Sequence, residues 1–220
     1  MILGFIFSHL NAIILGMWLG FFAVVLVRFL RPYWVKNISY KQLILVAAVL
    51  HLLYATFITW GQYYIWSTSS DFTRALLAAP LPIEAPLPVM LEWIRPYFGG
   101  TLGYFTYYAF GRFFLSVIIL FVVTGIFYAI FKFWHARRNN FGIEGPELLC
   151  VLMLIAGWPG VVVLGPLGFA VAILFSVSAL VLLKKTQTSL LPAFLVVTPI
   201  ALIAAKPILD FLHLYALLKI

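Results

Sequence analysis

The sequence has 220 residues, of which 65% are hydrophobic and only 9% are charged, and its formal net charge is +8. Soluble domains are about half apolar and about a quarter charged, so these values exclude an ordinary soluble protein and indicate an integral membrane protein. The basic residues lie in the gaps between apolar runs, which fits membrane topology better than nucleic-acid binding.

We therefore expect an all-α polytopic integral membrane helix bundle that forms a single domain over residues 1–220. A helix needs about 20 apolar residues to cross the hydrocarbon core of a bilayer, and we assign about six transmembrane helices on this basis. In chain order the expected spans are Phe5–Leu30, Leu43–Trp66, Tyr104–Phe131, Leu148–Leu164, Leu167–Leu183 and Leu190–Leu209, the last with a tail to Leu218.

The fourth and fifth segments are short and nearly continuous. The sequence GWPGVVVLGPLG between them carries Pro159 and Pro166, and proline interrupts helices because it lacks an amide hydrogen and its ring clashes with the preceding turn. Pro207 is a third expected break, in the last span. Over residues 148–183, two tight spans and one span with a re-entrant piece both fit the pattern. We favour two spans, since the basic gaps on either side then fall on one face of the membrane.

Basic residues are concentrated in three gaps between spans. Cytoplasmic loops of membrane proteins carry an excess of Lys and Arg, so we place these gaps in the cytoplasm and both termini on the non-cytoplasmic side. A bacterial inner (plasma) membrane is the natural setting for this pattern. The residues concerned are Arg28, Arg31, Lys36 and Lys41, then Lys132, Arg137 and Arg138, then Lys184 and Lys185.

The longest gap, 67–103, is an expected extracytoplasmic Pro-rich loop with short amphipathic helices. An Ala-Pro-Leu-Pro unit occurs twice within it, and proline at this spacing favours polyproline II. A short amphipathic segment around Trp93 follows. The loop is either a stiff connector packed on the helix ends or a rigid docking surface for another protein. The docking residues would be Pro80, Pro82, Pro86, Pro88 and Trp93.

Three charged residues lie in or beside apolar runs: Arg112, Lys206 and Asp210. Intramembrane charges often line ion or solute paths, and Arg112 could bind an anionic headgroup. The alternative is that they lie at the outer interface, where long side chains reach water. We favour the interfacial interpretation, because tyrosines precede Arg112 and Lys206 lies near the outer end of its helix.

His9 and His213 raise a redox hypothesis. Membrane-bound haem b needs two imidazoles that face each other from different helices at similar depth, and these two histidines lie near the same outer face in the expected topology. They provide for one haem at most. No metal site is expected, and Cys150 is the single cysteine, which excludes a CxxC site and an internal disulfide.

The sequence contains no HExxH, GxSxG or P-loop pattern, each of which would indicate a specific chemistry. We therefore expect a non-catalytic integral membrane subunit of a larger transport, secretion or energy-converting complex. Its partners would be the lipid bilayer and other membrane protein subunits, with no nucleic acid and no cofactor. Two alternatives stay open: a haem-b electron-transfer subunit, and a lipid-modifying enzyme that acts at the outer headgroups through Arg112, Asp210 and His213.

Overall fold

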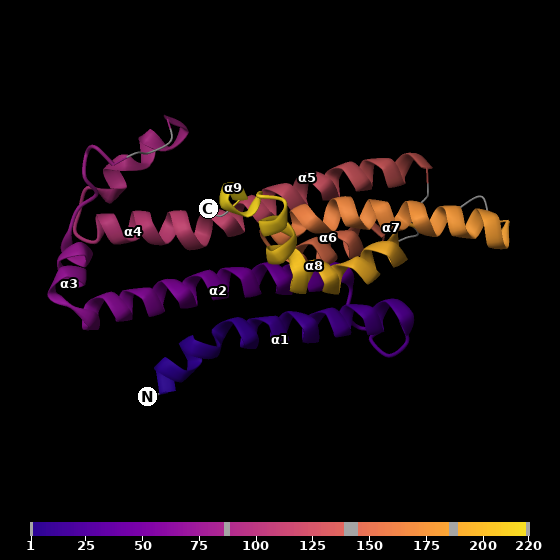
Figure 1. Cartoon of the computed structure of the whole chain (residues 1–220), viewed down its shortest axis with the longest axis horizontal. Helices are drawn as coiled ribbons and strands as arrows, with labels where there is room; N and C mark the ends of the chain where they lie inside the picture. The colour runs from indigo at the N-terminus through magenta and orange to yellow at the C-terminus, as the bar shows by residue number, and fades with distance from the viewer. Residues whose placement is uncertain (1, 86–88, 139–144, 185–188, 219–220) are drawn as a thin grey trace. The chain divides into compact units, whose positions relative to one another are not determined.

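The computed structural model describes residues 2–85, 89–138, 145–184 and 189–218. These residues form helices and connecting turns and contain no strand (Figure 1). The chain divides into two compact units, which we call the bundle unit (Met1–Val49 with Ile119–Lys219) and the loop unit (Leu50–Ile118, with Ile220). Helices α2 (Tyr40–Ser69) and α5 (Leu115–Arg138) contribute residues to both units.

Five helical segments are long and apolar enough to cross a membrane, which agrees with a polytopic integral membrane protein. They are His9–Leu30 within α1 (Ile2–Leu30), Tyr40–Ser69, Gly103–Ala136, Gly160–Leu182 within α7 (Gly160–Leu183), and α8 (Leu191–Phe211). The other elements are α3 (Asp71–Ala78), the 3₁₀ helix η1 (Val89–Phe98), α4 (Gly103–Ala109), the π-helical turn η2 (Phe110–Phe114), α6 (Gly145–Ala156) and α9 (Tyr215–Leu218).

The expected fourth and fifth spans have the wrong boundaries. Helix α6 has 12 residues, a length of about 18 Å at 1.5 Å per residue, which is short of the roughly 30 Å hydrocarbon core. The helix break lies at residues 157–159, where Gly157 has a φ of 65° and Pro159 precedes α7. Pro166 and Pro207 lie inside α7 and α8, so the expected breaks there are corrected. Helices packed in membranes tolerate proline, because neighbouring groups satisfy the freed backbone atoms.

Helix α6 forms the core of the bundle unit. It contacts α1, α7 and α8, and every residue from Leu148 to Ala156 is buried. At its first turn the Tyr128 hydroxyl of α5 donates a hydrogen bond to the Glu147 carboxylate at 3.2 Å. A helix that is apolar on all sides either lies in a protein core or spans a membrane. Since α6 is too short to span the hydrocarbon core, its burial against α1, α7 and α8 provides the apolar surroundings that its sequence requires.

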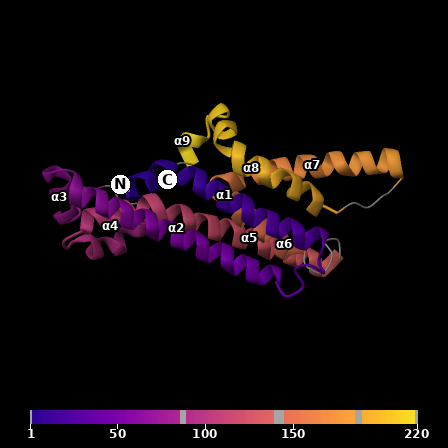
Figure 2. The same ribbon diagram turned by 90° about the horizontal axis from the view of Figure 1, so that it is seen from below.

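Helices α7 and α8 run antiparallel. At one end, a Cβ placed on Gly160 would lie 3.6 Å from both the carbonyl oxygen of Ala201 and the Cβ of Ala205. At the other end, the rings of Phe169 and Phe194 meet edge to face at 5.4 Å. Figures 1 and 2 both show α8 alongside α7. The pairing fixes the direction in which the chain runs through the core.

The chain reverses direction between α6 and α7. Glu147, at the start of α6, contacts Tyr128 of α5. Phe169, nine residues into α7, stacks on Phe131, which is also in α5, with 6.4 Å between the ring centres. The ends of α1, α5 and α7 consequently lie at the same end of the bundle unit (Figure 1). The three basic gaps of the sequence adjoin these helix ends.

Candidate functional site

The loop unit contains a closed loop, residues 79–104, which we call the braced loop. Its two ends are joined by backbone hydrogen bonds: the Leu81 amide donates to the Phe98 carbonyl at 3.0 Å, and the Tyr104 amide donates to the Ala79 carbonyl at 3.1 Å. Loops whose ends meet in this way are compact and often functional. The structure describes this loop except for residues 86–88.

Arg95 holds the interior of the braced loop. Its guanidinium donates hydrogen bonds to the carbonyl oxygens of Ile83 at 2.8 Å, Ala85 at 3.0 Å and Pro82 at 3.3 Å. It also forms a bidentate ion pair with Glu92, with the closest approach at 2.7 Å. The hydrogen bond from Arg95 lowers the pKa of the Glu92 carboxyl. One side chain thus joins η1 to the proline-rich segment, since the guanidinium fork has five donors in fixed directions.

The proline-rich segment departs from the expected polyproline II. The Ala85 amide donates to the Pro82 carbonyl at 3.0 Å, which closes a β-turn, whereas polyproline II has no internal hydrogen bonds. Pro80 and Pro82 lie in the described part of the loop, and Pro86 and Pro88 lie outside the described residues. The turn brings three carbonyl groups towards Arg95.

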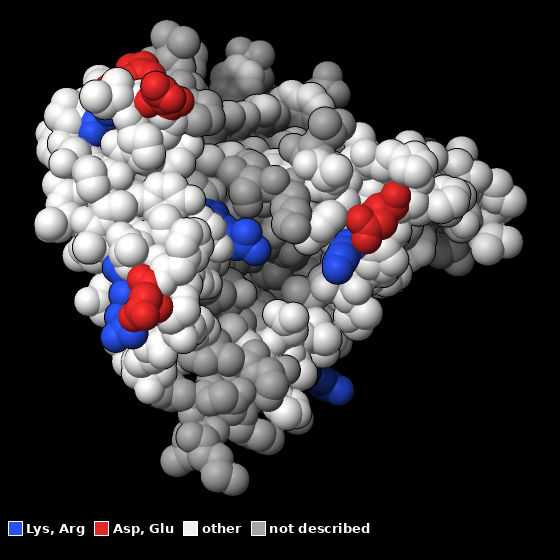
Figure 3. All heavy atoms as spheres, turned by 60° about the vertical axis from the view of Figure 1, so that its left-hand side comes forward, with Lys and Arg blue, Asp and Glu red and all other residues white. Residues whose placement is uncertain are grey.

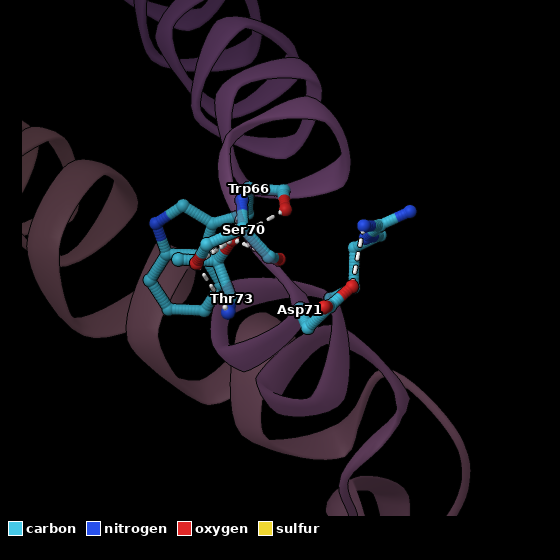
Figure 4. A network of polar contacts seen from close by, with 5 residues as sticks. Trp66, Ser70, Asp71 and Thr73 are labelled. Atoms are coloured by element: carbon cyan, nitrogen blue, oxygen red, sulfur yellow. Dashed lines mark hydrogen bonds and ion pairs between the residues drawn. The ribbon is translucent and has the colours of Figure 1, made fainter.

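A short capped helix leads into the braced loop. Ser70 is the N-cap of α3 and forms a reciprocal capping box with Thr73. The Ser70 amide donates to the Thr73 hydroxyl at 3.1 Å, and the Thr73 amide donates to the Ser70 hydroxyl at 3.2 Å. The Thr73 hydroxyl also donates to the Trp66 carbonyl at 2.8 Å (Figure 4). Capping satisfies backbone amides that have no partner within a helix, and here it also fixes the angle between α2 and α3.

An aromatic cluster supports the other end of the loop. The Trp66 indole packs on three aromatic rings. The distances between ring centres are 5.4 Å to Phe105, 5.1 Å to Tyr108 and 6.3 Å to Tyr104, on which the indole stacks. Leu77 of α3 is buried against the same group. These contacts anchor α3 and α4 on the end of α2, so both ends of the braced loop leave from a packed base.

Gly103 closes the loop because no larger residue fits there. A Cβ at this position would lie 1.8 Å from the Phe98 carbonyl oxygen, far inside van der Waals contact. The preceding residue, Leu102, has a φ of 69°, in the left-handed region that costs an L-residue about 1–2 kcal/mol. The backbone conformation at the closure is therefore imposed by the surrounding contacts.

The braced loop displays large apolar side chains to the outside. Ile83 is 89% exposed, Trp93 is 71% exposed and Tyr97 is 79% exposed. Charge on the loop unit is balanced, and acidic side chains lie next to basic ones rather than in a patch of one sign (Figure 3). Its charged residues are Asp71, Arg74, Glu84, Glu92, Arg95 and Arg112. The described part of the braced loop thus presents exposed apolar side chains beside an internal Glu92–Arg95 ion pair and one further acidic residue, Glu84.

Arg112 lies on η2, the π-helical turn between α4 and α5. Its side chain is exposed, and its guanidinium carbon lies 5.7 Å from the centre of the Tyr108 ring. Arg112 belongs to the loop unit, whereas Lys206 and Asp210 belong to the bundle unit. Neither unit therefore assembles the three charged candidates of the sequence into one cluster.

Lys206 and Asp210 lie near the end of α8, and both are exposed. The Lys206 ammonium lies 5.7 Å from the centre of the Tyr215 ring, in α9. No ion pair among the described residues joins Lys206 to Asp210. Lysine over an aromatic ring at a helix end is an arrangement typical of a side chain that reaches an interface.

His213 ends helix α8. Its φ is 55°, its amide donates to the Asp210 carbonyl at 3.1 Å, and the Leu214 amide donates to the Leu209 carbonyl at 2.9 Å. These two bonds, together with the left-handed backbone conformation of His213, define a Schellman motif. Histidine is one of the non-glycine residues enriched in this conformation. His213 thus has a structural role in the backbone. His9, on α1, is exposed.

Two residues that organise the structure were missed by the sequence patterns. Arg95 lies three residues after Glu92, a spacing typical of a local ion pair, and that signal was available. Trp158 contacts a segment far along the chain, and no local pattern indicates it. The described residues contain no group of three or more His, Cys, Asp or Glu that could hold a metal ion.

The chain matches no protein-family model, and neither a curated protein nor a solved structure matches it.

Proposed function

We propose that this chain is a non-catalytic integral membrane subunit of a larger transport, secretion or energy-converting complex, and that the braced loop is its docking surface for a partner subunit. The observation that carries the proposal is that one loop combines internal hydrogen bonds with exposed apolar side chains. Arg95 fixes the backbone of the segment that presents Ile83, while Trp93 and Tyr97 lie on the adjoining η1.

Rigid, exposed aromatic residues favour protein docking over a solvated connector. Trp and Tyr are enriched among the residues that dominate binding energy, and a surface ordered before binding loses little conformational entropy when the partner arrives. Internal pairing of Glu92 with Arg95 leaves no unpaired charge from that pair to be buried at an interface. The expected partner surface is therefore apolar and lies close to the membrane.

The proposed topology places the braced loop on the non-cytoplasmic side. The basic gaps adjoin the ends of α1, α5 and α7, which lie together at one end of the bundle unit, and the positive-inside rule assigns that end to the cytoplasm. In this proposal α6 enters the membrane part of the way and α7 returns, so they form a re-entrant element. Both termini then lie on the non-cytoplasmic side. The proposed membrane is the inner membrane of a bacterium.

Site-specific cross-linking tests the docking proposal. A photoreactive phenylalanine analogue replaces Trp93 in the tagged full-length chain, and cross-linked products are identified after irradiation of intact cells. We expect one dominant protein partner, which also purifies with the wild-type chain after mild detergent extraction. Trp93→Ala with Tyr97→Ala should lower its yield about tenfold or more, as removal of hot-spot residues does.

The matched control is Phe72→Ala, which removes an exposed aromatic residue of the loop unit outside the braced loop and should leave the yield unchanged. A chain that purifies as a solitary monomer, and that cross-links at position 93 only to lipid, would refute the docking proposal.

A further inference from the structure

The bundle unit carries a second exposed surface, the segment Arg28–Lys41 that joins α1 to α2, which we call the basic loop. Arg28 gives the loop its shape: its Nε donates to the Ile38 carbonyl at 2.9 Å, and its guanidinium carbon lies 5.4 Å from the centre of the Tyr40 ring. Arg28 therefore bridges the two ends of the loop, from the last turn of α1 to the start of α2.

A capping box at the start of α2 fixes the other side of the loop. The Ser39 amide donates to the Gln42 side-chain oxygen at 2.8 Å, and the Gln42 amide donates to the Ser39 hydroxyl at 3.3 Å. Between the helices, the Trp34 amide donates to the Arg31 carbonyl at 3.0 Å. The loop is thus ordered by its own hydrogen bonds, and its shape precedes any binding event.

The exposed side chains of the basic loop combine positive charge with aromatic rings. Arg31, Lys36 and Lys41 are exposed, and the segment 28–41 contains no acidic residue. Tyr33 is 89% exposed and Trp34 is 79% exposed. Amphipathic aromatic residues are enriched at the headgroup level of membranes, and basic residues beside a membrane span attract anionic lipids.

We propose that the basic loop binds anionic phospholipid headgroups. Arg31, Lys36 and Lys41 contact the lipid phosphates, and Tyr33 and Trp34 insert into the interface between headgroups and acyl chains. Both flanking helices are long and apolar enough to span a membrane, so the loop is held where lipid headgroups lie. This position favours a lipid over a soluble acidic protein or nucleic acid, which would leave the two rings in water.

The test measures which lipids stay bound to the full-length chain. The protein is reconstituted in nanodiscs of equal phosphatidylglycerol and phosphatidylcholine, extracted in mild detergent, and its retained lipids are counted by native mass spectrometry. We expect the wild type to retain phosphatidylglycerol preferentially. In the triple variant Arg31→Gln, Lys36→Gln, Lys41→Gln, the ratio of retained phosphatidylglycerol to phosphatidylcholine should fall by about fivefold for each charge removed.

A control with Arg74→Gln and Lys206→Gln removes positive charge elsewhere in the chain and should retain the wild-type preference. A second measurement follows tryptophan fluorescence with brominated phosphatidylglycerol, where quenching should fall when Trp34→Phe is introduced. An unchanged lipid ratio in a triple variant whose circular dichroism matches the wild type would overturn the proposal. Release of phosphatidylglycerol by millimolar inorganic phosphate would also overturn it, by identifying a free anion as the ligand.

Discussion

The indole Nε1 of Trp158 donates a hydrogen bond to the backbone carbonyl of Leu218 at 3.0 Å, across 60 residues of sequence. Trp158 lies in the break between α6 and α7, and Leu218 lies at the end of α9. Tyr215 and Leu218 also pack on the cluster of Val163, Ala205 and Leu209. The end of the described chain is therefore folded onto the point where the core reverses direction.

Trp158→Phe should loosen α9 while the bundle stays folded. The variant keeps an aromatic ring but loses one hydrogen bond, which is worth about 1 kcal/mol. We expect the amides of residues 215–218 to exchange about fivefold faster, because local opening becomes easier by that free energy. Hydrogen exchange with mass spectrometry measures this rate.

Trp93→Phe is the matched control for this change, since Trp93 is an exposed indole in the loop unit. Its exchange at residues 215–218 should equal that of the wild type. If Trp158→Phe also leaves this exchange unchanged, the hydrogen bond to Leu218 does not hold α9 in place.

His213→Gly should stabilise the protein. The residue has a φ of 55°, a conformation that costs an L-residue about 1–2 kcal/mol and costs glycine almost nothing. We expect a gain of about 1 kcal/mol, or a rise in melting temperature of about 3 °C for a chain of this size. His213→Ala keeps a Cβ and should give no such gain. Thermal unfolding in detergent measures both variants, and a lower melting temperature for His213→Gly would show that the imidazole itself has a stabilising role.

Gly168→Ala should destabilise the contact between α7 and α8. A Cβ at this position would lie 2.6 Å from the Phe194 ring, so the ring must move, and overpacking of this kind typically costs about 1–3 kcal/mol. Gly165→Ala, on the same helix, adds the same methyl group where nothing lies within 4 Å. It should be neutral or slightly stabilising, because alanine favours helix more than glycine does. Equal melting temperatures for the two variants would contradict the observed packing.

The length of the apolar runs predicted the long helices well, but it did not predict the position of the helix break between Leu148 and Leu183, which depends on packing. The spans expected at Phe5–Leu30, Leu43–Trp66 and Tyr104–Phe131 correspond to α1, α2 and the continuous segment from α4 to α5. Each has an apolar run that is sufficient to span a bilayer without help from neighbours. Between Leu148 and Leu183 the apolar run is longer than one span and shorter than two, so local composition could not place the break.

The position of that break depends on contacts between distant residues. Pro159 and Pro166 are equivalent by local rules, yet only Pro159 adjoins a break. Helix α7 continues through Pro166, and two residues later Gly168 packs closely against Phe194 of α8, a contact that no local pattern indicates. The same limit applies to the candidate sites: the exposed loop was visible as a proline repeat, but its β-turn depends on Arg95, more than ten residues away in sequence from Pro82 and Ile83.

The order of the braced loop should depend on pH through Glu92. The hydrogen bond from Arg95 lowers the pKa of the folded carboxyl below its ordinary value of 4.5, so the ionised form is favoured in the folded loop. A depressed pKa adds stability that is present above the ordinary value and is lost as the pH falls through the folded value. We expect proteolysis within residues 79–104 to be slow at pH 7 and to accelerate below about pH 4.5.

Two variants identify the group responsible for this pH dependence. Glu92→Gln removes the carboxylate that pairs with Arg95, so its loop should be cleaved faster than the wild type at pH 7. The difference between the two rates should shrink as the pH falls below the ordinary value of 4.5, with both rates at each pH measured by a protease that is active at that pH. Glu84→Gln removes the same charge from the same loop, and Glu84 is not among the described contacts of Arg95; it should keep the wild-type profile. The same profile in Glu92→Gln as in the wild type would show that the ion pair does not order the loop, because the acid sensitivity would then belong to another group.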